Sequence, residues 1–241
     1  MVEELNAVVL RVTPYSDRHA IVAAYSREMG RVSLLVPAGN SRGAARARAM
    51  TMPLSLITCQ AQLRPGQEIL KISQLAPLYV ADNIIASPMR RLVAQFLAET
   101  LTAILRESQA DEAIFDYISQ AVMLLDSGRD ESVANFHLWF LYRLSALVGI
   151  EPDMSTYRDG YCFDMREGVF KPSQPLGSPF IPSTEATTMA SLSRMNADNM
   201  HVFRFNRNDR NAVLDAILGY YSIHYASLRS LRSLDVLRSL F

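Results

Sequence analysis

The sequence predicts an α+β protein in which a small barrel of five strands precedes a bundle of helices. Three observations support this fold class. Five short runs of apolar and β-branched residues lie within the first 80 residues, separated by turn-forming residues. Beyond them, apolar residues recur at three- and four-residue spacing, as on one face of a helix. A single hairpin pattern interrupts this helical part.

The five expected strands are short and closely spaced. Turn residues occur at 13–17, 28–30 and 64–66, and Val8, Leu10 and Val12 alternate with other residues along the first run. Five strands with no long helix between them favour a closed barrel over a βαβ sheet. Barrels of this size often bind single-stranded nucleic acid. The expected strands are Leu5–Thr13, His19–Ser26, Arg31–Val36, Leu54–Gln62 and Ile69–Leu78.

Helices are expected after residue 81. Ser87 followed by Pro88 is a helix-start signal, and an apolar face continues from there to Leu105. Asp111 is expected to cap the next helix. The most apolar helix, predicted from about Glu131 to Val148, is expected at the centre of the bundle.

A hairpin and a proline-rich loop divide the helical part. Two short strands are expected at 161–164 and 168–171, and helices resume near residue 183 and again near residue 208. The predicted domains are therefore 1–80 and 81–241, with 151–182 as a hairpin and loop insertion. In the tail, leucines recur every third residue from Leu228 to Leu240. This spacing winds around a helix, which favours burial by several neighbours over binding of one partner helix.

Charge is unevenly distributed although the formal net charge is zero. Residues 1–80 hold nine Arg or Lys and five Asp or Glu, a balance of +4, whereas residues 81–241 have a balance of −4. A basic N-terminal module indicates an anionic partner, although solubility alone also explains a charge of this size. No disulfide framework, signal peptide or membrane span is expected, and we predict a cytoplasmic, nucleoid-associated protein.

The connection between the third and fourth strands is the main candidate for chemistry. Residues 37–67 contain four arginines and no acidic residue, and small residues surround the first three arginines. We expect a flexible loop whose guanidinium groups reach phosphates; a solvated connection without function is the alternative. Aromatic residues are scarce in this part, which favours backbone contacts over base readout. The DNA-binding candidates are Arg42, Arg46, Arg48, Arg18, Arg31, Arg64 and Lys71.

No enzyme signature is present. The sequence has no P-loop, no Gly-x-Gly-x-x-Gly, no nucleophile elbow and no His-Glu-x-x-His. The four histidines fall in different expected elements, and the paired acids fall at termini or helix starts. We therefore expect no catalytic residues, no cofactor and no metal.

Several segments of the chain form a recognisable series. They are 7–11, 15–22, 25–32, the basic Ala-rich loop, 96–99 and the junction from Phe140 through Gly149 to Pro152-Asp153. No single segment is diagnostic, but their order and spacing together are specific. In this order they resemble the RecO family of bacterial recombination mediators, and the resemblance covers nearly the whole chain.

The resemblance implies an N-terminal OB-fold, a helical domain and non-enzymatic work on DNA. Proteins of this kind bind single- and double-stranded DNA and anneal complementary strands. They engage the C-terminal tail of the single-strand-binding protein SSB and pair with RecR, so that RecA loads onto coated single strands. It also implies that Arg42, Arg46 and Arg48 contact phosphates. An SSB-tail pocket is expected on the helical domain, with Arg90, Arg91, Arg106 and Arg143 as candidates by residue type.

The sequence departs from the family at one place. Many relatives carry a four-cysteine zinc site after the Pro-Asp junction, but here only Cys162 is present in that region. Because structural zinc needs about four Cys or His ligands, we predict a degenerate zinc-finger region without zinc. Packing of Tyr161, Phe163 and Phe170 is expected to hold the hairpin instead.

A second function hypothesis stays open at this point. The −4 balance of residues 81–241 and the leucine-rich tail also fit an interaction scaffold. In that case the helical domain recruits protein partners and DNA contact is incidental.

Overall fold

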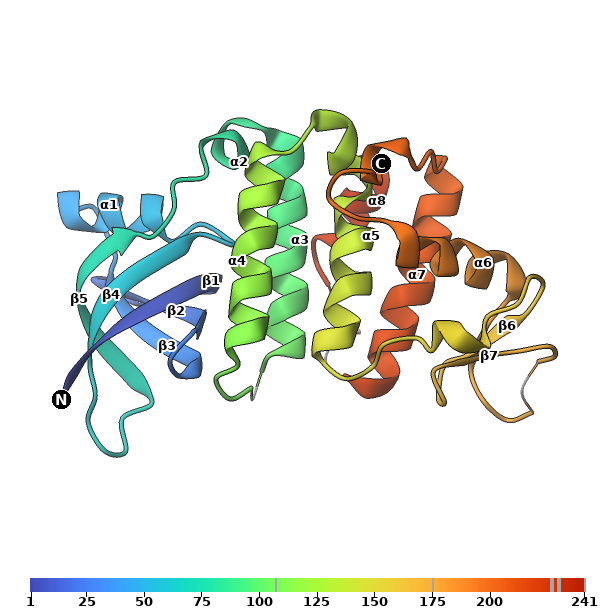
Figure 1. Ribbon diagram of the computed structural model, residues 1–241. Coiled ribbons are helices and arrows are strands. Elements are labelled where there is room, and N and C mark those ends of the chain that lie inside the picture. The colour runs from blue at the N-terminus through green and yellow to red at the C-terminus, as the bar shows by residue number, and fades with distance from the viewer. Residues whose placement is uncertain (107, 175, 226–227, 229–230, 241) are drawn as a thin grey trace. The chain divides into compact units, whose positions relative to one another are not determined.

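The computed structural model describes residues 1–106, 108–174, 176–225, 228 and 231–240 (Figure 1). The chain forms two compact units, residues 1–127 and 128–241. The first contains a barrel and the helices that follow it, and the second contains the remaining helices and a small sheet. The α+β architecture expected from the sequence is confirmed.

The barrel consists of five strands, as the sequence predicts. They are β1 Val2–Ser16, β2 His19–Ser26, β3 Gly30–Pro37, β4 Leu56–Gln62 and β5 Ile69–Pro77. The strand order β1-β2-β3-β5-β4 closes because β4 also pairs with β1. All neighbours are antiparallel except β3 and β5. This OB-like barrel leaves no free strand edge.

Alternation along the strands explains the barrel interior. Leu5, Ala7 and Val9 of β1 point inward beside Val22 and Ala24 of β2, and all five are buried. Their period of two is that of a strand with one buried face. The Val8, Leu10 and Val12 alternation noted in the sequence lies on the other face of β1, where Val8 and Leu10 are also buried but Val12 is exposed.

The connection between β3 and β4 is not the flexible loop that we expected. It contains helix α1, Arg42–Met50. Ser41 caps this helix by accepting a hydrogen bond from the Ala44 backbone N–H at 3.1 Å. Ala44 and Ala47 are buried, and Ala47 joins the barrel core. Ala44 and Ala47 therefore form the packing face of an ordered helix, whereas Ala45 and Ala49 are exposed.

Three helices follow the barrel within the first unit: α2 Asp82–Ala86, α3 Pro88–Ile104 and α4 Glu112–Ser127. The expected start signals are confirmed. Ser87 accepts a hydrogen bond from the Arg90 N–H, and the Asp111 carboxylate accepts from the N–H groups of Ala113 and Ile114. Figure 1 shows α3 and α4 side by side, and both pack against β1.

Helix α5, Asp130–Leu147, is the core element of the second unit. Eleven of its residues are buried, and it packs against α7, Arg207–His224. Helix α6, Ser183–Ser191, packs on α7 as well. The short elements are η1 Met154–Thr156, η2 Leu192–Arg194, η3 Met200–Val202 and α8 Leu234–Leu240. Of the tail leucines, Leu228 and Leu237 are buried and Leu240 is half exposed.

The expected hairpin is present as part of a three-stranded sheet in the order β7-β6-β8. Its strands are β6 Cys162–Asp164, β7 Val169–Lys171 and β8 Phe180–Ile181. The rings of Phe163 and Phe170 pack 4.9 Å apart, and Tyr220 of α7 packs edge-on against Phe163. Tyr157 contacts Phe170 in the same way, so aromatic packing holds this region, with Tyr157 and Tyr220 beside the two phenylalanines.

Within the described part of the chain, no helix has the length and hydropathy needed to cross a membrane.

Candidate nucleic-acid interface

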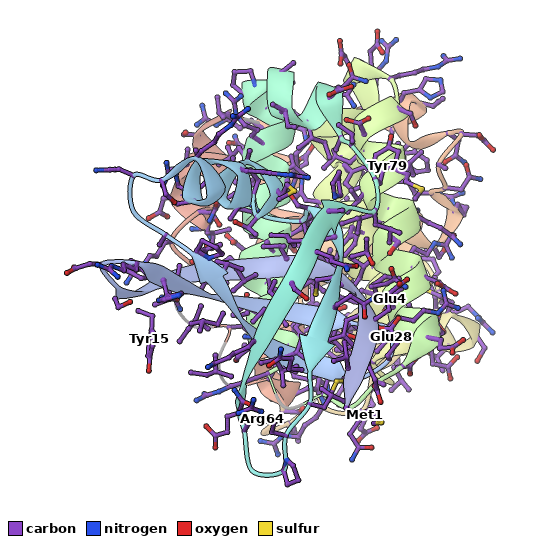
Figure 2. The ribbon with its side chains drawn as sticks, turned by 90° about the vertical axis from the view of Figure 1, so that its left-hand side faces the viewer. Met1, Glu4, Tyr15, Glu28, Arg64 and Tyr79 are labelled. Carbon is purple, nitrogen blue, oxygen red and sulfur yellow. The ribbon has the colours of Figure 1, made fainter. Side chains whose placement is uncertain are left out.

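Four basic side chains lie on α1 and at the adjoining tip of the β1–β2 hairpin, and one exposed aromatic ring extends from the other face of the hairpin near the same tip (Figure 2). We call this the hairpin–helix surface; it consists of Tyr15, Arg18, Arg42, Arg46 and Arg48. All five residues are exposed. The surface therefore combines positive charge with a ring on which a base can stack.

The three arginines of α1 have an exposed position because of helical spacing. The positions between them, Ala44 and Ala47, face the barrel and are buried. Arg42 and Arg46 are four residues apart and so lie on the same side of the helix. Arg48 donates a hydrogen bond to the Gly39 carbonyl oxygen, which holds its stem against the helix entry. The helix contains no acidic residue that would neutralise these charges.

Backbone contacts fix the hairpin beside α1. The Ala38 N–H donates to the Arg18 carbonyl oxygen at 2.8 Å, and His19 pairs with Pro37 in the β2–β3 ladder. Gly39 has a positive φ of 88°, and a Cβ at this position would lie 2.9 Å from the carbonyl oxygen of Asp17. The close approach requires glycine, and it places Arg18 at the same end of the barrel as the arginines of α1.

Tyr15 supplies the aromatic part of the surface. It is 61% exposed near the hairpin tip, and Figure 2 shows its side chain extending away from the barrel. The acidic residues Glu4 and Glu28 lie on the opposite side of the barrel in this view. Tyr25, the other aromatic residue of the barrel strands, is fully buried, and its hydroxyl donates to the Gln109 carbonyl oxygen at 3.1 Å. Only Tyr15 of the two can therefore stack on a base.

Arg64 and Lys71, two further DNA-binding candidates, are both exposed on the barrel. Arg64 follows β4 near the N-terminus, where the Leu63 N–H donates to the Met1 carbonyl oxygen; Figure 2 shows Arg64 and Met1 at this edge. Lys71 pairs with Leu35 in the last pair of the β3–β5 ladder, two residues before β3 ends at Pro37. Both side chains are therefore accessible to phosphates from the barrel surface.

Arg31 lies near the start of β3, and Pro37 is the last residue of the same strand. At about 3.3 Å per residue, Arg31 is roughly 20 Å from Pro37, where the connection to α1 begins. The Nη1 atom of Arg31 is buried and has no hydrogen-bond partner among the described residues. Burial lowers the pKa of Arg31, and the nearby charges of Arg106 and Arg11 lower it further. The proximity of Arg11, Arg31 and Arg106 could not be predicted from the sequence, because the strand register is needed to bring residues 11 and 31 together.

The four arginines expected at an SSB-tail pocket fall in different environments. Arg90 is 5% exposed and donates to the Leu125 and Asp126 carbonyl oxygens at the end of α4, so it stabilises the first unit from within. Arg91 and Arg106 are exposed in the same unit. Arg143, in the second unit, is partly buried and donates to the carbonyl oxygens of Ser193 and Met195.

The chemistry available at the hairpin–helix surface is electrostatic attraction and stacking. The described residues include no group of three or more His, Cys, Asp or Glu side chains placed to hold a metal ion. The two cysteines are buried, and burial raises the pKa of the Cys59 thiol to about 11, so this thiol is uncharged at neutral pH. Fixed guanidinium charges are suited to phosphates and need no proton transfer.

Comparison with known proteins identifies the family of the chain. The family model "Recombination protein O N terminal" matches residues 1–80, and "Recombination protein O C terminal" matches residues 88–235. The chain is similar to proteins named "DNA repair protein RecO" from Phocaeicola vulgatus and Bacteroides fragilis, each 36% identical over the full length of both chains. The protein of that name from Porphyromonas gingivalis is 34% identical over 98% of each chain. The chain therefore belongs to the RecO family of DNA repair and recombination proteins.

Proposed function

We propose that this protein is a non-enzymatic recombination mediator that binds single- and double-stranded DNA through the hairpin–helix surface and anneals complementary strands. The observation that carries the proposal is the short helix α1, which exposes Arg42, Arg46 and Arg48 without any acidic residue. Annealing brings two polyanions together, and phosphate neutralisation by arginines lowers their repulsion without reading the base sequence.

The surface suits a single strand in particular. Guanidinium groups on α1 engage consecutive phosphates, while the exposed ring of Tyr15 offers a stacking platform for one base. One aromatic platform gives little sequence preference, because every base has a π-face. Arg18 extends the phosphate path along the hairpin, and Arg31, Arg64 and Lys71 provide weaker contacts elsewhere on the barrel.

The partner contacts belong to the same proposal. With RecR, the protein helps RecA load onto single strands coated by SSB. In this proposal, residues 1–80 bind DNA and residues 81–241 bind the protein partners. For the acidic SSB tail, the exposed Arg91 and Arg106 are better candidates than Arg90, because the guanidinium of Arg90 is occupied inside the fold.

The test is fluorescence anisotropy of labelled single-stranded DNA across a salt series. The wild type is compared with the variant Arg42→Glu/Arg46→Glu/Arg48→Glu. Each phosphate contact contributes about −0.7 to the log–log salt slope, so three lost contacts make the slope shallower by about 2. We expect the triple variant to lose most of its affinity at low salt and to anneal complementary strands slowly.

A matched control carries the same charge change elsewhere. Arg158, Arg166 and Arg194 are exposed residues of the second unit, and their replacement by Glu is expected to leave the salt slope nearly unchanged. Equal binding by the wild type and the α1 variant would remove the hairpin–helix surface from the mechanism. Restoration of DNA repair in cells by residues 81–241 alone would favour the scaffold hypothesis instead.

A further inference from the structure

The first unit contains a second group of basic side chains, which we call the three-arginine cluster; it consists of Arg11, Arg31 and Arg106. The three residues come from β1, β3 and the connection from α3 to α4. The charges of Arg106 and Arg11 are close enough to Arg31 to lower the pKa of its guanidinium. Arg11 and Arg106 are exposed, whereas Arg31 is half-buried. The cluster therefore presents two accessible guanidinium groups beside a third that is partly desolvated.

A β-bulge places Arg11 on the outer face of the barrel. Val9 points into the barrel core, so regular alternation along β1 would turn Arg11 inward as well. The register shifts between these two residues and leaves Arg11 paired with Ala23, which lies outside the barrel core. Ala23 pairs in turn with Ser33, two residues from Arg31 on β3. Bulges re-aim side chains in this way next to functional sites, and this one brings Arg11 to the face of Arg31.

Tight backbone packing at Gly30 brings Arg106 to the same place. A Cβ on Gly30 would collide with backbone atoms of Gln109, so the α3–α4 connection lies directly against the start of β3. The Arg31 N–H donates to the Ser108 carbonyl oxygen at 3.0 Å. Arg106 is two residues from Ser108, and these backbone contacts hold it beside Arg31.

The charge of the cluster is not balanced by an ion pair with any carboxylate in the part of the chain that the structure describes. Glu112 and Asp116, two acidic residues of α4, pair with Arg27 instead. An anion relieves the repulsion between neighbouring guanidinium groups, and the planar fork of arginine suits phosphate. Tyr25, the partner of Arg31 in the β2–β3 ladder, is fully buried. The cluster therefore offers charge without a ring on which a base can stack.

These properties suit a strand that is about to be paired. A strand that is held by its phosphates alone keeps its bases free, whereas Tyr15 on the hairpin–helix surface can engage a base. Arg31 is also roughly 20 Å along β3 from Pro37, where the connection to α1 begins. We propose that the three-arginine cluster binds the phosphate backbone of a second DNA strand, so that one chain holds both complementary strands. This inference rests on the proposed annealing function and adds to it the site of the second strand.

The test reverses the charge of the exposed members of the cluster and leaves Arg31 in place. The full-length wild type is compared with Arg11→Glu/Arg106→Glu. Arg158→Glu/Arg166→Glu carries the same charge change on exposed residues of the second unit and serves as the control. Fluorescence anisotropy measures binding of one labelled strand, and energy transfer between two labelled complementary strands measures annealing. We expect the cluster variant to bind the first strand within about twofold of the wild type but to anneal about tenfold more slowly, because only the second strand loses its phosphate contacts.

The stoichiometry of binding measures capture of the second strand directly. The probe is an oligodeoxythymidine of about ten nucleotides, within the site size of one OB-fold, and sedimentation counts the strands bound per chain. We expect two strands for the wild type and the control, and one strand for the cluster variant. Arg11→Gln/Arg106→Gln removes the charges without reversing them and is expected to anneal at an intermediate rate, which keeps the test decisive if the glutamate variant fails to fold.

Annealing at the wild-type rate by the cluster variant would overturn the proposal. Weaker binding of the first strand with a shallower salt slope would also overturn it, because the cluster would then lie on the path of that strand. The α1 variant Arg42→Glu/Arg46→Glu/Arg48→Glu distinguishes a failure of the proposed function, in which it would bind and anneal like the wild type. A hexaglutamate peptide tests the other polyanion: peptide binding that the cluster variant loses, with annealing unchanged, would assign the cluster to an acidic protein segment instead.

Discussion

The Ala38 backbone N–H donates a hydrogen bond to the carbonyl oxygen of Arg18 at 2.8 Å, and this contact ties the tip of the β1–β2 hairpin to the segment that enters α1. Residues that are 20 positions apart in the sequence are thereby held at one end of the barrel. The arginine of the hairpin and those of α1 consequently form one surface, whose geometry depends on this short backbone junction as well as on the packing of Ala44 and Ala47.

Gly39 is the position at which this junction is most sensitive. Gly39→Ala places a Cβ in a left-handed conformation, which costs about 1–2 kcal/mol, and also 2.9 Å from the Asp17 carbonyl oxygen. We expect a larger loss of stability in urea unfolding than for Gly66→Ala, because Gly66 also has positive φ but open space around it. DNA affinity should fall in Gly39→Ala only; equal effects of the two substitutions would contradict the role of the junction.

Tyr15 is expected to contribute stacking without charge. Base stacking on an aromatic side chain is worth about 1–3 kcal/mol, so Tyr15→Ala should weaken single-strand binding about tenfold. The salt slope should stay as in the wild type, because no phosphate contact is lost. Tyr15→Phe keeps the ring and serves as the control. An unchanged affinity for Tyr15→Ala, measured by anisotropy, would show that no base stacks there.

Arg90 and Arg91 are adjacent in the sequence but should respond in opposite ways. Arg90 donates to two carbonyl oxygens at the end of α4 from a buried position, and hydrogen bonds from a charged group contribute about 1.5–3 kcal/mol. We expect Arg90→Ala to lower the free energy of unfolding by at least about 2 kcal/mol. Arg91→Ala, on the exposed side, should change it by less than about 0.5 kcal/mol. Circular dichroism during urea unfolding measures both, and equal losses would contradict the assignment.

The barrel could be predicted from the sequence because its strands follow a period of two with clear turn residues between them. Helix α1 could not, because Gly39, Asn40 and Ser41 resemble a loop and an isolated helix of this length is marginal in water. Two signals were nevertheless present: Ser41 is a favourable N-cap, and alanine is the best helix former. What the sequence lacks is the barrel surface against which Ala44 and Ala47 pack.

The sequence offered arginines as candidates for the site, but it did not indicate which of them lie close together in the fold. We expected Arg90 at the SSB-tail pocket by residue type, but the phase of α3 places it on the same face as the buried Val93, Ala94 and Leu97. The helical pattern therefore contained a signal for its burial. Arg31 and Arg11 are brought together only by the β1–β2–β3 register, which includes a bulge between Val9 and Arg11. Contacts that depend on such irregularities cannot be derived from spacing alone.

Asp164 should make the stability of the second unit depend on pH. Burial alone would raise the pKa of its carboxyl, but hydrogen bonds from Lys171, Ser178 and two backbone N–H groups outweigh this and hold the pKa well below its usual range. A carboxyl with a depressed pKa stabilises the fold at pH values above its unfolded pKa of about 4, and this contribution is lost as the pH falls toward the folded pKa.

Breaking a buried charge pair costs about 3 kcal/mol or more, so Asp164→Asn should be destabilised by that amount at pH 7 and by progressively less below pH 4. Urea unfolding followed by the fluorescence of Trp139 measures this, with exposed Asp159→Asn as the control. A difference between wild type and Asp164→Asn that does not shrink with acidification would mean that the carboxylate charge does not stabilise the sheet.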